Sequence, residues 1–181
     1  DNTYHYLNQI PFSDHGALLD PPTADVSARC ASMLAQLGDT TGKSAALNRA
    51  IAYLKRAQEK DGSWYGRWGM NYLYGTWSVL CAFNAAGVDP SSPEVQKAVR
   101  WLLAIQNKDG GWGEDGDSYK LDYKGYEAAP STASQTAWAV LGLMAAGRID
   151  HPAVERGIAY LMANQGDDGF WYEKRFTATG F

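Results

Sequence analysis

The stretch at residues 49–64, RAIAYLKRAQEKDGSW, decides the fold because its skeleton occurs three times. The second copy covers 97–112 (KAVRWLLAIQNKDGGW) and the third covers 156–171 (RGIAYLMANQGDDGFW). Each copy opens on a basic residue and continues at matched positions with an aromatic residue and leucine, a glutamine, an Asp-Gly pair and a tryptophan. Matches at this many positions in one short chain indicate a repeat protein.

Each motif forms the second part of a helical hairpin. Apolar helices are expected from Thr23 or Asp25 to Leu37, over 75–86 and over 132–146, each stopped by a glycine (Gly38, Gly87, Gly147). Amphipathic helices follow, the first after a polar linker at 39–44 and ending near Gln58, the others over 93–106 and 152–165. The repeats are expected at about 25–64, 75–112 and 132–171, after an irregular loop at 1–24.

The hairpins predict an all-α fold of one domain over 1–181, an α/α toroid with almost no β-sheet. Apolar helices with few charges belong on the inside, and helices charged on one face belong outside. Such toroids close with about six pairs, so three hairpins form an incomplete (α/α)6 barrel whose exposed apolar faces need a partner. We expect that partner to be the remainder of a longer chain, or a second copy in a homodimer.

Composition narrows the function classes. The chain has 181 residues and a net charge of −4, so it lacks the basic surface of a nucleic-acid-binding protein. Aromatic residues make up 13% of the sequence, which suits a core and a pocket for apolar or cationic ligands. Cys30 and Cys81 lie in apolar segments without a metal-ligand spacing and are expected to be buried thiols in a reducing compartment. With no long apolar run, any membrane contact is expected to be peripheral.

An insertion separates the second and third motifs. The repeat interval grows from 48 residues (Arg49 to Lys97) to 59 (Lys97 to Arg156), and the excess lies in 113–131. Long loops in compact repeats often carry function. Its carboxylates raise the possibility of calcium, but the sequence does not fit a twelve-residue EF-hand loop, so a solvated structural loop is favoured.

The chain resembles the C-terminal part of bacterial squalene-hopene cyclases. The three motif copies match the QW motif of that superfamily, and longer strings match squalene-hopene cyclases in particular: DGSWYGRWGMNYLYGT (61–76), NKDGGWGED (107–115), PSTASQTAW (130–138) and FTATGF (176–181). The resemblance implies an enzyme that uses no cofactor and no metal. An aspartic acid protonates squalene or a related polyprene, and the cation passes through successive ring closures. It also implies a peripheral (monotopic) protein at the cytoplasmic face of the membrane.

The family's acid lies in an Asp-x-Asp-Asp motif, which is absent from this sequence, so the chain by itself is expected to be inactive. The resemblance implies that Asp25, Arg29 and Tyr74 support that acid from behind, with arginine where the family often has histidine. The alternative for Asp25 and Arg29, four residues apart on one helix, is an intrahelical ion pair.

The resemblance also implies substrate contacts. Trp68 matches an aromatic residue of the cavity wall, and Phe181 matches another that faces later cations. Phe12 falls where the family narrows its substrate entrance. The repeated glutamines and tryptophans are expected instead to tie the repeats together, by glutamine amides bonded to backbone and tryptophans stacked on their neighbours. These residues are Gln58, Gln106, Gln165, Trp64, Trp112 and Trp171.

Two other functions share the predicted architecture. One is a non-catalytic α/α-toroid binding module, which needs no apolar central cavity and no upstream acid. The other is a protein prenyltransferase β-subunit, which needs zinc ligands. The histidines that could serve (His5, His15 and His151) lie in loops or at a helix start, away from both cysteines.

Overall fold

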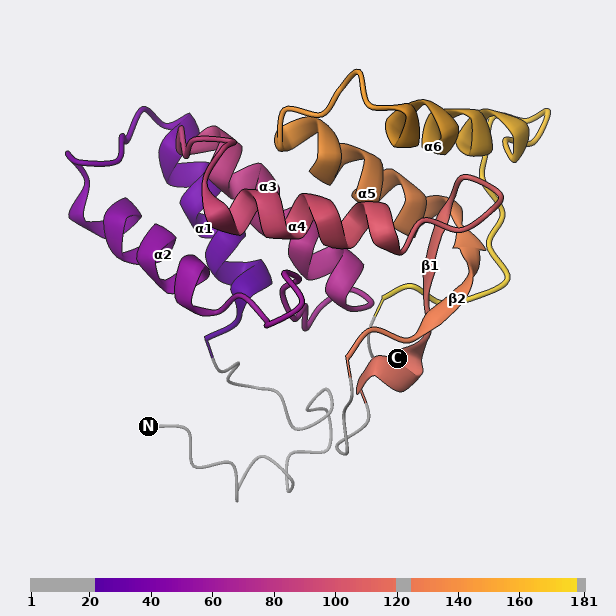
Figure 1. The fold of residues 1–181 in the computed structure, drawn as a ribbon, viewed down its shortest axis with the longest axis horizontal. Helices are drawn as coiled ribbons and strands as arrows, with labels where there is room; N and C mark the ends of the chain where they lie inside the picture. Colours follow the sequence, from indigo (N-terminus) through magenta and orange to yellow (C-terminus); the bar gives the residue numbers. More distant parts are fainter. Residues whose placement is uncertain (1–21, 120–124, 179–181) are drawn as a thin grey trace.

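The computed structural model describes residues 22–119 and 125–178, in which three helical hairpins follow one another (Figure 1). The inner helices are α1 (Ala24–Gln36), α3 (Tyr72–Ala85) and α5 (Ala133–Ala145). The outer helices are α2 (Ala45–Arg56), α4 (Pro93–Ala104) and α6 (Pro152–Ala163). The predicted hairpins are confirmed, whereas the expected loop at 1–24 lies mostly outside the described residues.

The inner helices form the central layer. α1 packs against α3, and α3 packs against α5, while α4 contacts both α3 and α5. α3 and α5 contain no charged residue, and a helix that is apolar all round is stable only when it is covered. The largest fully buried side chains include Trp64, Trp112, Tyr72, Phe83 and Leu80.

Glycines end the inner helices as predicted. Gly38, Gly87 and Gly147 have φ values of 100°, 70° and 72°, the left-handed conformation that glycine adopts without strain. After each one a backbone N–H bonds back into the helix, for example from Val88 to the carbonyl of Phe83 at 2.9 Å. The turn to each outer helix therefore follows from the local sequence.

The insertion adds a small sheet that the helical pattern did not predict. β1 (Trp112–Glu114) pairs antiparallel with β2 (Ala128–Thr132), with Trp112 opposite Thr132 and Glu114 opposite Ala128. A short 3-10 helix, η3 (Gly116–Tyr119), follows β1. Figure 1 shows the ribbon of β1 and β2 running away from the ends of α4 and α5. The expectation of almost no sheet holds for the hairpins, but the insertion is an exception.

Both ends of the three-hairpin array expose apolar side chains. On α1 these are Val26 and Met33, with Leu37 just after the helix. At the other end they include Leu141, Met144, Ile158, Met162, Phe170, Trp171, Tyr172 and Phe176. This exposure is the one expected of an open array.

Both cysteines depart from the expected burial. Cys30 is exposed and Cys81 is half-buried, because these positions lie on faces of α1 and α3 that the described residues do not fully cover. Burial still raises the pKa of the Cys81 thiol. Within the described ranges, no helix has the length and apolarity needed to cross a bilayer.

Candidate functional site

The segment between Trp64 and Tyr74 is the centre of the site, and Asp25 of α1 holds its first half. Asp25 is fully buried, and its Oδ2 atom accepts hydrogen bonds from the backbone N–H groups of Arg67 (3.1 Å) and Trp68 (3.0 Å). Its Oδ1 atom is buried and has no hydrogen-bond partner among the described residues. The carboxylate therefore fixes the backbone that carries Trp68 and leaves one oxygen for a further donor.

Glu114 at the end of β1 holds the second half of the segment. Its side chain is 1% exposed and accepts three backbone N–H bonds at the start of α3, from Asn71 (3.0 Å), Tyr72 (3.0 Å) and Leu73 (2.9 Å). A carboxylate here satisfies the free N–H groups of the first helical turn and interacts favourably with the helix dipole. Burial raises the pKa of Glu114 and outweighs these N–H groups, which lower it.

The carbonyl groups of the segment are also bonded by side chains from elsewhere. The hydroxyl of Tyr119 lies 2.8 Å from the carbonyl oxygen of Gly66 and 2.7 Å from that of Gly69. Gln135 of α5 donates from Nε2 to the carbonyl of Met70 at 3.3 Å, and the N–H of Met70 donates to the carbonyl of Thr177 at 2.8 Å. Three repeats thus converge on this one turn.

Tyr74 packs directly on the turn. A Cβ atom at Gly66 would lie 2.9 Å from the Tyr74 ring, and one at Gly69 would lie 2.4 Å from it, so only glycine fits at Gly69 without displacing the ring. The positions of Trp68 and Tyr74 are therefore both set by the backbone of residues 66–69.

An arginine and three aromatic rings connect the inner helices beside the turn. Arg29 donates from Nη2 to the Tyr74 hydroxyl at 2.8 Å, and its guanidinium carbon lies 5.4 Å from the ring centres of both Tyr74 and Trp77. Trp77 is stacked on Trp138 of α5, with centroids 6.0 Å apart and an interplanar angle of 10°. This geometry is that of cation–π contacts, in which a permanent positive charge occupies one side of the rings.

The predicted site residues fall into two groups. Asp25, Trp68, Arg29 and Tyr74 come together around the turn, and Trp68 is 38% exposed. Phe12 and Phe181 lie outside the described residues. The intrahelical ion pair considered for Asp25 and Arg29 is not formed, because each side chain bonds to the 66–74 segment instead.

Sequence reasoning missed Glu114, Tyr119 and the Trp77–Trp138 stack. The insertion was predicted to be a solvated loop, yet Glu114 is buried inside it. One signal was present: a glutamate stands two residues after the final tryptophan in the second and third motifs, as Glu114 and Glu173. Nothing in the sequence pattern indicated that the Tyr119 hydroxyl would bond to Gly66 and Gly69, which lie 53 and 50 residues earlier in the chain.

Gln58 and Gln106 tie adjacent repeats together, as expected, whereas Gln165 bonds within its own turn. Gln58 donates to its own Asp-Gly turn at Gly62 (2.9 Å) and to the carbonyl of Glu94 at the start of the next outer helix (2.8 Å). Gln106 does the same with Gly110 (2.8 Å) and Ala153 (2.9 Å).

The tryptophans depart from the prediction in one detail. Trp64 does not stack on its neighbour: it meets Phe83 edge-on at 89°, while its Nε1 donates to the carbonyl of Leu54 at 2.7 Å. The last described copy repeats this indole bond, from Trp171 to Leu161 at 2.8 Å. The indole is therefore fastened to its own outer helix, and the neighbouring repeat packs against the ring.

Comparison with known proteins settles the family. The model of the squalene-hopene cyclase C-terminal domain matches residues 1–181. The chain belongs to the squalene-hopene cyclase family. It is 67% identical to the squalene-hopene cyclase of Bradyrhizobium diazoefficiens and 49% identical to that of Alicyclobacillus acidocaldarius, with the whole chain covered in both cases. It spans only 27% and 28% of the length of these relatives.

Solved structures support the toroid. The chain superposes on ent-copalyl diphosphate synthase from Streptomyces platensis with a TM-score of 0.61 and 22% sequence identity, covering 86% of this chain and 29% of that one. At this identity the likeness shows the fold alone. Membership of the cyclase family argues against the alternative of a protein prenyltransferase subunit.

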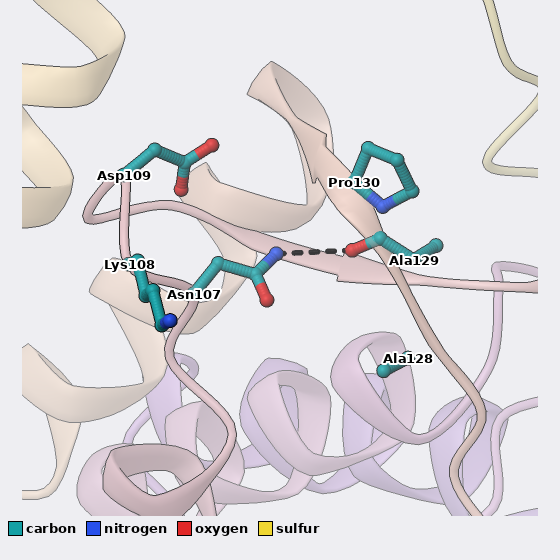
Figure 2. Close-up of a pocket in the computed structure, with 6 residues that line it drawn as sticks. All are labelled: Asn107, Lys108, Asp109, Ala128, Ala129 and Pro130. Carbon is teal, nitrogen blue, oxygen red and sulfur yellow. Dashed lines mark hydrogen bonds between the residues drawn. The ribbon is translucent and has the colours of Figure 1, made fainter.

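The described residues also include one histidine and several surface hollows. His151 caps α6, its Nδ1 accepting from the N–H of Ala153 at 3.1 Å, and no metal-ligand cluster occurs in the described parts of the chain. An open hollow of about 500 Å³ lies beside Asn107. The amide of Asn107 donates to the carbonyl of Ala129 at 3.0 Å, a bond drawn in Figure 2. The hollow is a junction within the cyclase scaffold. A smaller groove of about 250 Å³ lies between α1 and α3, beside Arg29 and Trp77.

Proposed function

We propose that this chain is the C-terminal part of a cyclase that converts squalene or a related polyprene into a polycyclic triterpene such as hopene or hopanol. The observation that carries the proposal is the arrangement of Asp25: a buried carboxylate with one oxygen bonded to the Trp68 turn and the other open to a donor. The relatives are named squalene-hopene cyclases, which supports the substrate class.

The chemistry balances without a cofactor. A proton adds to the terminal alkene, the resulting cation closes successive rings by attack of the next double bond, and proton loss or capture of water ends the sequence. Aromatic faces such as that of Trp68 stabilise passing positive charge by about 0.5–2 kcal/mol each. A surrounding wall that excludes water prevents early capture of the cation.

Asp25 acts in this scheme as support for the acid. Its bonds to Arg67 and Trp68 hold Oδ2, so Oδ1 is directed to a group that the described residues do not supply. Arg29 adds a permanent positive charge, which does not titrate as histidine would. We propose that these two residues and Tyr74 hold an acid contributed by another part of the chain in its protonated, donor-competent state.

The proposal is tested with the complete cyclase chain and squalene. We expect Asp25→Asn to lower turnover roughly tenfold or more, because each unit of pKa lost by the supported acid changes its ionisation tenfold. We expect Trp68→Ala to increase partly cyclised products. Unchanged turnover and products in both variants would contradict the site, and a complete wild-type chain that does not cyclise squalene would contradict the function.

The 181-residue chain by itself is expected to be inactive, because no Asp-x-Asp-Asp acid occurs in its sequence.

We also propose that the complete protein works as a peripheral protein at the cytoplasmic face of the membrane, since its substrate dissolves in lipid. Flotation with vesicles, and release by detergent rather than by salt, tests that placement. Light scattering of the complete protein tests whether it forms a homodimer.

A further inference from the structure

The turn at residues 66–73 is held by side chains that arrive from the insertion. Two insertion residues make five of its hydrogen bonds: Glu114 accepts from three backbone N–H groups, and the Tyr119 hydroxyl lies within 2.8 Å of two carbonyl oxygens. The amide of Asn71 adds bonds to the carbonyl (3.3 Å) and hydroxyl (3.2 Å) of Ser118. Residues 114–119 of the insertion therefore bond the turn on both its N–H and its carbonyl sides.

Tyr119 is placed to control the two aromatic residues of the site. The carbonyls that it bonds belong to Gly66 and Gly69, which bracket Trp68 in the sequence and contact the ring of Tyr74 in space. One hydroxyl proton is shared between two buried acceptors, and the ring is further fixed by an edge contact with Tyr65 at 5.7 Å. Loss of the hydroxyl frees both carbonyls at once and leaves them without that donor.

Glu114 controls the direction of α3. Its carboxylate bonds the N–H groups of the N-cap residue Asn71 and of the first two residues of a helix that carries Tyr74 and Trp77, so the carboxylate helps to fix both rings. Gln135 supports Glu114 in turn, accepting from its N–H at 3.0 Å and donating to its carbonyl at 3.2 Å. The position of the turn is thereby linked to α5.

Comparing Glu114 with its counterpart in the third repeat shows which of its contacts belong to the scaffold in general and which are particular to this site. Glu173, the counterpart of Glu114, accepts from the N–H of Ser134 at 2.5 Å near the start of α5, so a glutamate that bonds the start of an inner helix is a property of both repeats. Glu173, however, is exposed and bonds one backbone N–H instead of three. The tyrosine bonded to two carbonyls is found, within the described ranges, at the turn that carries Trp68.

We propose that Tyr119 and Glu114 are positioning residues, which set Trp68 and Tyr74 relative to the substrate without touching it. The inference rests on the proposed function. It assigns Glu114 and Tyr119 of the insertion a role in catalysis: to keep the aromatic surface rigid while the cation migrates past it. In an active site of this kind, a displacement of about 1 Å can cost on the order of a hundredfold in rate.

The test uses the complete cyclase chain with Tyr119→Phe and the matched control Tyr126→Phe. Tyr126 lies in the same insertion and donates its hydroxyl to the carbonyl of Gly113 at 2.6 Å, not to a carbonyl of the turn. Both variants lose the hydroxyl of a half-buried tyrosine, so similar shifts in melting temperature are expected. We expect Tyr119→Phe alone to lower kcat roughly tenfold and to raise the proportion of partly cyclised products.

The outcomes are distinguishable. A wild-type chain without cyclase activity overturns the proposed function, whereas an active wild type whose Tyr119→Phe variant keeps the kcat and product ratio of Tyr126→Phe overturns this inference. If Tyr119→Phe does not accumulate as folded protein, Ser118→Ala replaces it, because this change removes one acceptor of Asn71 from the same turn. A two- to threefold shift in product ratio is then expected, and an unchanged ratio refutes the role.

Discussion

The second and third copies of the repeated motif have the same local geometry and different surroundings. Trp112 and Trp171 both donate from Nε1 to the leucine ten residues earlier, at 2.9 Å and 2.8 Å. Yet Trp112 is fully buried and Trp171 is 44% exposed. The difference teaches that the motif builds its own turn from local contacts, whereas burial of the motif requires the next repeat.

The glutamines of the second and third motifs differ in the same way, because one bonds to the next repeat and the other bonds within its own turn. Gln106 donates both to its own turn and to Ala153 of the next outer helix, whereas Gln165 donates to Gly169 of its own turn at 2.9 Å. Where a further repeat covers the motif, a threonine of the following inner helix also bonds to the tryptophan. Thr136 accepts from the N–H of Trp112 at 3.0 Å, as Thr76 does for Trp64. The third copy is thus a complete motif at an open end of the array.

The largest contrast is expected for the tryptophans. We expect Trp112→Ala to lower the free energy of unfolding of the 181-residue chain by about 3–5 kcal/mol, the usual cost of removing a buried aromatic side chain. Trp171→Ala should cost less than half as much, because its ring is already partly in water. Urea unfolding followed by circular dichroism measures both. In the complete protein the two costs should converge if a further repeat covers Trp171; two unequal losses there would refute that covering.

A smaller difference in unfolding free energy is expected between alanine substitutions at the glycines of the second and third Asp-Gly turns. Gly110 and Gly169 have φ values of 88° and 86°, so alanine is strained at both by roughly 1–2 kcal/mol. At Gly110 a Cβ atom would also lie 2.8 Å from the carbonyl oxygen of Arg156 on the next outer helix, whereas at Gly169 the nearest atom is 4.0 Å away. We expect Gly110→Ala to cost about 2–4 kcal/mol in the same unfolding experiment. Equal costs would show that the contact between repeats relaxes freely.

The difference in stability between alanine substitutions at Gln106 and Gln165 should be smaller again. Gln106→Ala leaves a carbonyl on each of two repeats without its donor, which we expect to cost about 1–3 kcal/mol. Gln165→Ala removes one exposed bond and should cost about 0.5 kcal/mol. Thermal unfolding of the two variants beside wild type provides the measurement, and a Gln165 variant as unstable as the Gln106 variant would contradict the comparison.

The smallest expected effect is a difference in pH dependence between Glu114 and Glu173. Burial raises the pKa of Glu114 above the ordinary value of 4.5, so the folded state holds its proton to a higher pH than the unfolded state does. The stability associated with that proton is present below pH 4.5 and is lost as the pH rises through the folded pKa. Glu114→Gln should flatten the stability curve between pH 4.5 and the folded pKa, when unfolding is measured at several pH values. Glu173→Gln serves as the exposed control, and a curve that is flattened equally by both substitutions would contradict the assignment.

Much of the scaffold was predictable because its causes are local. Helix positions follow from apolar periodicity, and helix ends follow from Gly38, Gly87 and Gly147, where only glycine adopts the required φ without strain. The roles of the repeated glutamines followed from their recurrence at one place. Asp25, Trp68 and Tyr74 were proposed as site residues through resemblance to a family and not through their spacing.

What remained hidden depends on contacts between distant segments. Glu114 in a polar insertion looked like a solvated carboxylate, and its burial comes from the free N–H groups at the start of α3, forty-odd residues earlier. Arg29 and Asp25 share a helix face, yet the 66–74 segment takes up both side chains and prevents their pairing. Helical spacing describes neighbours on one element and says nothing about a competing partner on another.

By itself, the sequence determined three helical hairpins, their glycine stops and the self-contained motif at 49–64, because hydrogen bonds and backbone conformations within a few residues decide those features. Only the tertiary structure decided which copies of the motif are buried, and that the insertion holds the Trp68 turn. Burial and long-range hydrogen bonds exist only when separate repeats meet, and the identity of the meeting atoms is not encoded in the period of any one segment.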